Sequence, residues 1–305
     1  MSEKCNFSLE LCDTGCSCNN LFLTKYITKN HWVYWALKLK IKTKIGITIK
    51  KLWSLVTMDR IDDYEQLKNR IVHWIKDYAE INNIKSLVIG VSGGIDSAVV
   101  STLCVETGLP VYALGMPILQ NKEQESLSDY HIDWLASKYD NLVPYKFDLT
   151  GLFDEFCLTM DSHGFSKNKL ALANTRSRLR MVTLYQVAGS TSGIVVGTGN
   201  KIEDYGVGFY TKYGDGGVDI APIADLYKTE VWSLGKYLGI DQRIVDADPT
   251  DGLWDDSRTD EEQLGASYFE LEEAMENSTG PAVEILKNFN TMNRHKMEPI
   301  PTFKL

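Results

Sequence analysis

Residues 88–100 read VIGVSGGIDSAVV, and this stretch decides the fold. Its apolar start predicts a buried β-strand over Ser86–Val91, and its end predicts the beginning of a helix over Ser97–Thr107. Small and polar residues form the turn between them. A strand, a glycine-containing turn and a helix N-terminus direct backbone N–H groups and the positive end of the helix dipole toward one place. The stretch therefore predicts an anion-binding loop.

The side chains of this turn indicate which anion it binds. Gly93 and Gly94 permit positive φ and leave room for a phosphate, while Ser92 and Ser97 add hydroxyl donors. Asp96 would repel a phosphate unless a cation lay between them, so its presence predicts Mg²⁺ bridging Asp96 and phosphate oxygens. The turn matches neither the G-x4-G-K-[ST] nor the G-x-G-x-x-G nucleotide motif. The alternative is a simple strand-to-helix connection with a solvated aspartate.

Helices and strands alternate along the rest of the chain. Beyond the first strand and helix, the apolar pattern predicts helices over 62–83, 123–140 and 169–190, and strands over 111–117, 142–147 and 194–197. This alternation is typical of βαβ units with a parallel sheet. The strands are apolar almost throughout, which predicts a doubly wound α/β fold with helices on both faces of the sheet.

Two polar loops directly follow predicted strands. They are SGGIDS at 92–97 and GTGNKIED at 197–204. Ligands of parallel sheets bind at the carboxyl ends of the strands, so both loops should lie on the same rim. The stretch 199–217 is too long for a simple connection and is expected to be functional.

The chain of 305 residues divides into an extension and a domain. Residues 1–57 lack the periodicity of the rest, are basic and hold four of the six cysteines, so we expect a poorly ordered or non-native extension. The cysteine spacing fits no common zinc pattern, although a metal or disulfide cluster remains an alternative, as does a basic, aromatic arm. Residues 58–305 are expected to form the folded domain.

Charge and hydropathy exclude several classes of partner. The formal net charge is −9, which argues against a protein that binds nucleic acid broadly. The longest uncharged window, 181–200, is expected to be a buried helix followed by a buried strand rather than a membrane span. No signal peptide is evident, and Cys104 and Cys157 have the pattern of core thiols, so the cytoplasm is the expected location.

The strand–SGGIDS–helix unit resembles the PP-loop of ATP pyrophosphatases, which cleave ATP between its α and β phosphates. Further motifs lie downstream: NTRSRLRM at 174–181, GTGNKIEDYGVGFYTKYGDGGVDIAPIADLYKTEV at 197–231, PTDGLW at 249–254, RTDEEQLG at 258–265 and NRHKM at 293–297. Together these motifs resemble the NAD synthetase family. The resemblance runs from about Ile61 to the C-terminus.

The resemblance implies both a fold and a reaction. The fold is that of the adenine nucleotide alpha hydrolases. The reaction is the ATP-dependent amidation of nicotinic acid adenine dinucleotide (deamido-NAD) with ammonia through an acyl-adenylate, giving NAD, AMP and pyrophosphate. The family also implies a homodimer. Glutamine-dependent relatives carry a separate amidohydrolase domain, for which 57 residues are too few, so free ammonia is the expected nitrogen donor.

The resemblance also assigns residues. Those implied to bind ATP are Gly90, Val91, Ser92, Gly93, Gly94, Ile95, Asp96, Ser97, Thr198, Lys228 and Thr250. Those implied to bind the dinucleotide are Arg178, Lys212, Asp219, His295 and Lys296. Asp96 and Glu203 would hold Mg²⁺. No protein nucleophile is required, and Asp219 is a candidate acceptor of the ammonium proton.

One position departs from the family pattern. Ile202 precedes Glu203 where a small polar residue is familiar, and Asp204 adds a carboxylate that is an alternative metal ligand. The loops 249–254 and 258–265 are polar and are expected to be mobile and to close over ATP. His295 and Lys296 are expected to lie in a C-terminal tail without regular structure.

Two other functions fit parts of the pattern. A tRNA thiolase or a GMP-synthetase-like amidating module would share the PP-loop, but a thiolase would need a catalytic cysteine pair and a basic RNA-binding face. A binding module would hold an adenine nucleotide without cleaving it. Asp96 and Glu203 argue against such a module, because a non-cleaving protein has little need for two metal ligands.

Overall fold

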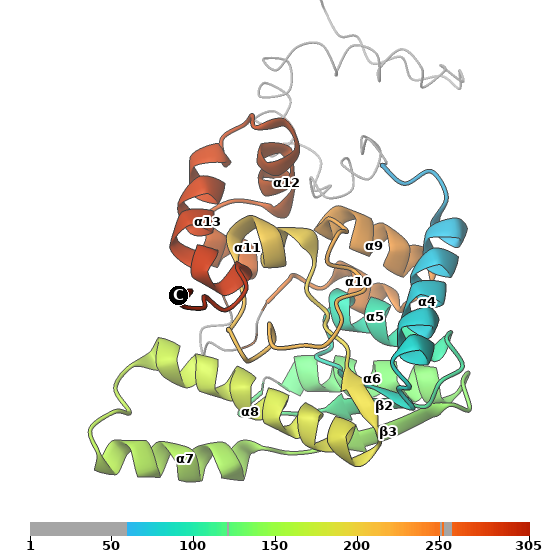
Figure 1. Cartoon of the computed structure of the whole chain (residues 1–305), viewed down its shortest axis with the longest axis horizontal. Coiled ribbons are helices and arrows are strands. Elements are labelled where there is room, and N and C mark those ends of the chain that lie inside the picture. The colour runs from blue at the N-terminus through green and yellow to red at the C-terminus, as the bar shows by residue number, and fades with distance from the viewer. Residues whose placement is uncertain (1–59, 121, 251, 253–257) are drawn as a thin grey trace, which may run out of the picture. The chain divides into compact units, whose positions relative to one another are not determined.

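A parallel sheet of four strands lies within the unit Ile61–Leu305 (Figure 1). In spatial order the strands are β3 (Leu142–Lys146), β2 (Val111–Gly115), β1 (Ser86–Gly90) and β4 (Gly193–Val195). The chain proceeds from β1 outward to β3 and then adds β4 on the other side of β1. This reversal creates a topological switch point between β1 and β4, which is where open α/β sheets bind ligands.

The structure is a computed structural model that describes residues 60–120, 122–250, 252 and 258–305. The predictions for residues 1–57, and the domain boundary at residue 58, lie outside the described residues. Among the residues that are described, none of the helices has the length and apolar character that crossing a membrane requires. The uncharged window 181–200 contains the end of helix α8 (Lys169–Ser190) followed by strand β4, as expected.

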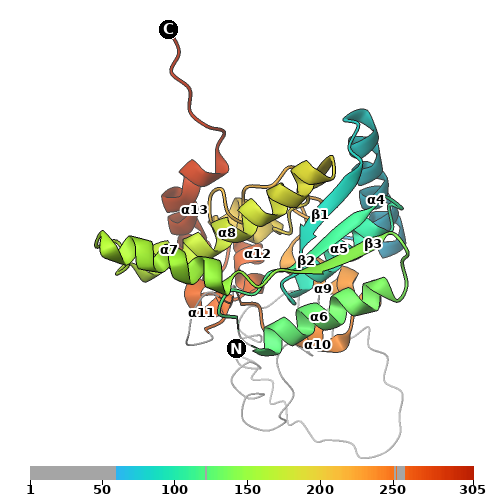
Figure 2. The same ribbon diagram turned by 90° about the horizontal axis from the view of Figure 1, so that it is seen from below.

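Helices cover both faces of the sheet. Leu87 and Ile89 of β1 join a core with α4 (Tyr64–Ile81), α5 (Ile95–Val105), α6 (Lys122–Ala136), α9 (Lys228–Tyr237) and α10 (Gln242–Asp246). Val88 points to the other face and joins a second core with α7 (Thr150–Ser162) and α8 (Lys169–Ser190). Figure 2 shows α8 on one side of the sheet and α5 and α6 on the other. The doubly wound fold is thereby confirmed.

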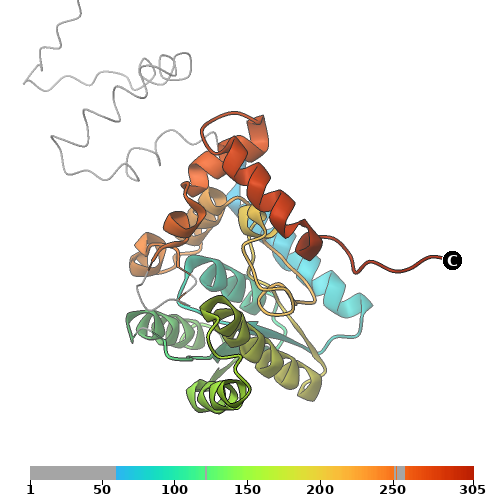
Figure 3. The same cartoon turned by 90° about the vertical axis from the view of Figure 1, so that its left-hand side faces the viewer.

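The C-terminal third adds a third core. It contains η1 (Ile202–Val207), a short π-helix, with α11 (Asp260–Leu264), α12 (Tyr268–Asn277) and α13 (Val283–Met297). Figure 3 shows α13, in red, at the opposite end of the unit from α7, in green. These helices bring C-terminal side chains to the rim where β1 and β4 end.

The sequence-based prediction was wrong in this C-terminal third. The segment 258–265 was expected to be a mobile loop, but it contains α11, which begins with a capping box between Thr259 and Glu262. His295 and Lys296 were expected in an irregular tail, but they lie in the last turn of α13. In the middle of the chain, helix α7 was also not predicted. Most of the loop 249–254 lies outside the described residues.

A buried histidine gives the domain a pH-dependent stability. His131 of α6 is 1% exposed, its Nε2 lies 3.0 Å from Ser101 Oγ, and its ring stacks on Trp134. Burial lowers the pKa of His131 to about 4. Between about pH 6.5 and pH 4, His131 is protonated in the unfolded chain and neutral in the folded chain. The free energy of unfolding therefore falls as the pH falls through this range.

We expect His131 alone to lower the free energy of unfolding by about 2 kcal/mol when the pH falls from 6.5 to 5. Denaturant unfolding of the wild type and His131→Gln at both pH values measures this, and the variant should lose less stability on acidification. His73→Gln is the control, because the His73 side chain is exposed. Equal pH slopes for the wild type and His131→Gln would contradict the prediction.

Candidate active site

The turn after β1 is held by hydrogen bonds between its own residues, and no side chain of the described residues caps the N-terminus of the helix that follows. Gly93 has φ of +87°, and Gly94 occupies the N-cap position of α5 without supplying a side chain. The Ser97 hydroxyl accepts from Ser92 N at 3.1 Å and donates to Gly94 O at 3.0 Å. A helix that begins in this way presents backbone N–H groups to an anion. The predicted phosphate-binding residues 90–97 thus have the expected arrangement.

The loop after β4 lies on the same rim. Val196 bridges to Ile220 beside β4, and η1 then begins at Ile202. The buried side chain of Asn200 accepts hydrogen bonds from Ile202 N at 3.1 Å and Glu203 N at 3.2 Å. Single-turn π-helices are frequent at functional sites. The backbone of Glu203 is therefore fixed by a neighbouring side chain.

The start of α9 supplies a buried lysine. Lys228 is the first residue of α9 and is 2% exposed. Glu230 accepts from Tyr227 N at 2.8 Å, and Glu272 of α12 accepts from Thr229 N and Thr229 Oγ1 at 3.1 and 2.7 Å. Two carboxylates therefore hold the first turn of this helix in place.

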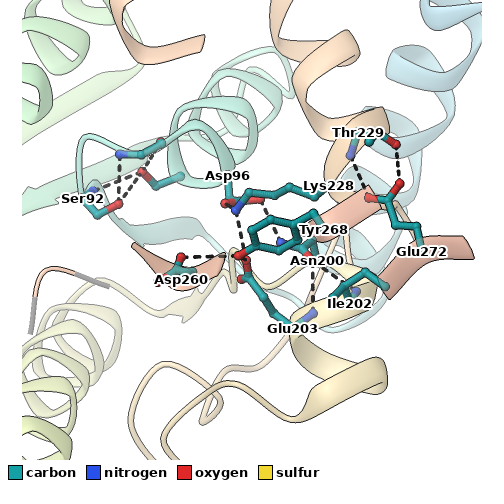
Figure 4. A network of polar contacts seen from close by, with 12 residues as sticks. Ser92, Asp96, Asn200, Ile202, Glu203, Lys228, Thr229, Asp260, Tyr268 and Glu272 are labelled. Carbon is teal, nitrogen blue, oxygen red and sulfur yellow. Dashed lines mark hydrogen bonds and ion pairs between the residues drawn. The ribbon is translucent and has the colours of Figure 1, made fainter. Parts of the chain in front are cut away.

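Three segments meet at the Lys228 ammonium. Its Nζ lies 2.5 Å from Asp96 Oδ2 and 3.0 Å from Glu203 Oε1, and Glu203 Oε1 also accepts from Tyr268 Oη at 2.6 Å (Figure 4). Burial opposes the charge of Lys228, but Asp96 and Glu203 raise its pKa far above the usual value. For Glu203, burial is outweighed by Lys228 and by the Tyr268 hydroxyl, so its pKa is lowered. The cluster is a charged network in which the ammonium is buried and the two carboxylates are half-buried.

The donor set fits a magnesium ion. The carboxylates of Asp96 and Glu203 both contact the Lys228 ammonium, so they lie close to one another. Mg²⁺ prefers one or two carboxylates together with phosphate oxygens. Within the described part of the chain, no three His, Cys, Asp or Glu side chains are grouped to hold a metal by themselves. An ion here would therefore rely on oxygens of a bound nucleotide.

The neighbouring carboxyl of Asp204 lies elsewhere. It lies against Gly199, where an added Cβ would come within 2.2 Å of Asp204 Oδ1. Burial and then Glu203 raise the pKa of Asp204 to about 7. Glu203, and not Asp204, shares the Lys228 ammonium with Asp96. This arrangement favours Glu203 over Asp204 as the second candidate metal ligand.

The predicted dinucleotide residues form a second cluster. Arg178 of α8 donates through Nε to Lys212 O at 3.3 Å, and Lys212 Nζ donates to His295 O at 2.8 Å. Lys296 Nζ donates to Tyr210 O at 2.8 Å and also to Gly208 O. The end of α13 is therefore joined to the loop at 208–212, and four of the five predicted residues lie in one group. Their role in binding stays a prediction.

Asp219, the fifth predicted residue, contacts the sheet. Its Oδ1 accepts from Tyr185 Oη at 3.0 Å and its Oδ2 accepts from Val195 N at 2.7 Å. Both carboxylate oxygens of Asp219 therefore have a donor within the fold. Its roles as ligand and proton acceptor stay predictions.

The two predicted threonines lie in the loops that follow β4 and α10. Thr198 is half-buried after β4. Thr250 Oγ1 accepts from Gly252 N and donates to Arg258 O, both at 3.2 Å. Thr250 thereby joins the two ends of the segment that connects it to α11.

Sequence reasoning missed several residues of the site. Asp215 accepts from Ser177 Oγ at 2.5 Å and Thr211 N at 3.0 Å, and burial raises its pKa. This bond holds the loop of Lys212 against α8. Asp215 lies within the motif at 197–231, so the sequence contained a signal that this residue could belong to the site. Tyr268 had none, since a tyrosine at the start of a helix resembles an ordinary core residue.

Comparison with known proteins identifies the family that this chain resembles in sequence and fold. The family model of NAD synthase matches residues 67–302. An NH(3)-dependent NAD(+) synthetase of Carboxydothermus hydrogenoformans is 36% identical over 241 residues, which are 77% of this chain and 95% of the relative. The solved structure of NMN synthetase from Francisella tularensis aligns with a TM-score of 0.74 and 32% identity, over 80% of this chain and 100% of that one. NH3-dependent NAD synthetase from Campylobacter jejuni aligns with a TM-score of 0.64 and 26% identity, over the same shares.

Proposed function

The chain belongs to the NAD synthase family, and from this premise we propose that it amidates deamido-NAD with ammonia and ATP to give NAD, AMP and pyrophosphate. The observation that carries the proposal is the meeting of Asp96, Glu203 and Lys228 beside the turn at 92–97. This arrangement supports the proposal, because the two carboxylates and the ammonium lie next to the turn that we propose binds the phosphates of ATP.

The reaction has two steps. First, a carboxylate oxygen of the nicotinate group attacks the α-phosphorus, the bond to the bridging oxygen breaks, and pyrophosphate leaves. Second, ammonia attacks the acyl carbon of the adenylate, AMP leaves with the bonding electron pair, and the nitrogen loses a proton. Neither step needs a protein nucleophile, so the protein contributes positioning and electrostatic stabilisation.

The charges of the site suit the first step. A carboxylate cannot approach a triphosphate until its negative charge is offset. Lys228 is fixed as an ammonium by two half-buried carboxylates, and the amides of the turn at 92–97 provide further donors. Mg²⁺ held by Asp96 and Glu203 would neutralise charge on the phosphates. Lys212 and Arg178 would face the dinucleotide.

A mononucleotide acceptor is the second candidate, which would give NMN in place of NAD. It is favoured by the alignment with the NMN synthetase, whose TM-score of 0.74 exceeds the 0.64 of the NAD synthetase from Campylobacter jejuni. The two candidates share the ATP chemistry. They differ only in the part of the acceptor beyond the first phosphate.

One experiment tests the function and separates the acceptors. Purified protein is mixed with Mg-ATP, ammonium and either deamido-NAD or nicotinic acid mononucleotide, and all products are followed. Equal amounts of NAD, AMP and pyrophosphate are expected with deamido-NAD. Omitting the acceptor should abolish all three products, and omitting ammonium should abolish NAD and limit pyrophosphate to a single turnover, because pyrophosphate leaves in the first step. Preferred formation of NMN would transfer the proposal to the mononucleotide, and ATP binding without pyrophosphate release would support a binding module instead.

We include a homodimer in the proposal. Apolar side chains of α7 and α8 are exposed in the single chain, namely Leu152, Leu158, Leu170 and Val182. An exposed apolar surface of this kind is typical of a protein–protein contact. Sedimentation of the wild type should give twice the chain mass, and V182K should shift the mass toward the monomer.

The proposal places the enzyme in the cytoplasm, with no nucleic-acid or membrane partner. It is supported by the use of ATP, by the free thiols Cys104 and Cys157, and by the negative net charge. Fractionation of cells that produce the protein would test the location.

A further inference from the structure

One side chain joins the two loops that carry the acidic residues. Asn200 is 0% exposed. Its Nδ2 donates to Asp96 Oδ1 at 3.3 Å, and its Oδ1 accepts from Ile202 N and Glu203 N (Figure 4). Asn200 and Asp96 are 104 residues apart in the chain. A single carboxamide therefore contacts the backbone of one acidic residue and the side chain of the other.

The chemistry of the amide fixes its orientation. The two backbone N–H groups require an acceptor, so the carbonyl oxygen must face them and the NH₂ group must face Asp96. The other oxygen of Asp96 lies against the Lys228 ammonium at 2.5 Å. Both oxygens of Asp96 thus have a donor, and the carboxylate plane is determined by Asn200 and Lys228 together.

We propose that Asn200 is a positioning residue that holds the carboxylates of Asp96 and Glu203 at the separation a shared cation requires. The inference rests on the proposed function, in which these two residues hold Mg²⁺. Residues that orient metal ligands typically change metal affinity 10–100-fold when they are replaced. Asn200 would act in this way on both ligands at once.

The competing explanation is that Asn200 only caps η1. Serine and aspartate are both good caps, so either replacement would preserve a capping role. Neither would preserve the positioning role, since serine is too short to reach Asp96 and aspartate offers no N–H donor. Asn200→Ser and Asn200→Asp therefore separate the two explanations.

A second asparagine provides the matched control. Asn293 of α13 donates through Nδ2 to Val207 O at 2.8 Å, at the other end of η1. Asn293→Ser removes a comparable bond to the same helix without touching Asp96. It should lower stability without changing metal affinity.

The test measures protein-bound Mn²⁺ by electron paramagnetic resonance, with α,β-methylene ATP as a nucleotide that cannot be cleaved between its α and β phosphates. We expect Asn200→Ser to weaken Mn²⁺ binding about 10–100-fold and Asn293→Ser to leave it unchanged. Wild-type Mn²⁺ affinity in Asn200→Ser would overturn the proposal.

The thermal unfolding midpoint is the second readout. In Asn200→Asp, the donor that orients Asp96 is lost and ion binding is expected to weaken, so added Mn²⁺ and nucleotide should raise the midpoint less than in the wild type. An equal rise in both proteins would overturn the proposal in favour of simple capping. Absence of Mn²⁺ binding by the wild type would overturn the metal site and this inference together, whereas normal binding without NAD formation would overturn only the proposed acceptor.

Discussion

An Asp96→Asn variant is expected to lose roughly 10²–10³-fold in pyrophosphate formation while remaining folded. The substitution preserves the size of the side chain and removes the charge that faces Lys228 and, in the proposed function, Mg²⁺. Lys228 would keep Glu203 as a partner at 3.0 Å. Pyrophosphate release at saturating ATP, measured at several Mg²⁺ concentrations, gives the loss directly.

The control for this variant is Asp225→Asn. Asp225 also pairs with a lysine, Lys201, at 2.7 Å, but its side chain is 93% exposed. This substitution should leave turnover unchanged. If Asp96→Asn retained wild-type turnover, the assignment of Asp96 as a metal ligand would be wrong.

Lys228→Met is expected to be damaging in two ways. It removes the ammonium that offsets phosphate charge, so pyrophosphate formation should fall on the order of 10³-fold. It also leaves the half-buried carboxylates of Asp96 and Glu203 without their cation. Breaking a fully buried ion pair costs roughly 3–5 kcal/mol of unfolding free energy, so a loss near or below the lower end of that range is expected. Denaturant unfolding measures the second effect without any substrate.

The effect of Mg²⁺ on the unfolding midpoint should show whether Lys228→Met is less stable because the cation is missing or because side-chain packing is lost. In Lys228→Met the ion would replace a missing positive charge, so Mg²⁺ should raise the unfolding midpoint more than it does in the wild type. Lys201→Met is the control, since its exposed pair with Asp225 should cost less than about 1 kcal/mol. An unfolding free energy equal to that of the wild type would show that the network contributes nothing to stability.

The sheet and the phosphate turn were predictable because both are local in sequence. Continuous apolar runs identified β1 and β4, and the small residues at 92–97 required a strand before them and a helix after them. Their position on one rim followed from the rule for parallel strands. The resemblance then named Asp96, Glu203 and Lys228, and the structure brings both carboxylates onto the Lys228 ammonium.

The remaining site residues were not predictable because their role depends on tertiary contacts. Tyr268 looks like any aromatic residue of a helix, and its hydroxyl reaches Glu203 only after α12 packs beside η1. Asn200 looks like a polar loop residue, and nothing in the sequence says that it is fully buried. The capping box at Thr259 and Glu262 was a visible signal that was overlooked, because the segment is short and polar.

The strand order has a consequence for how the protein matures. β1 must pair with β4 across more than a hundred residues, with Ser86 opposite Gly193, and Asp96 and Lys228 are 132 residues apart. Contacts of such sequence separation form late, because the intervening chain must first be ordered. Enzymatic activity should therefore recover after secondary structure during refolding, and a nascent chain still lacking α9 would contain the phosphate turn without the charge that balances it.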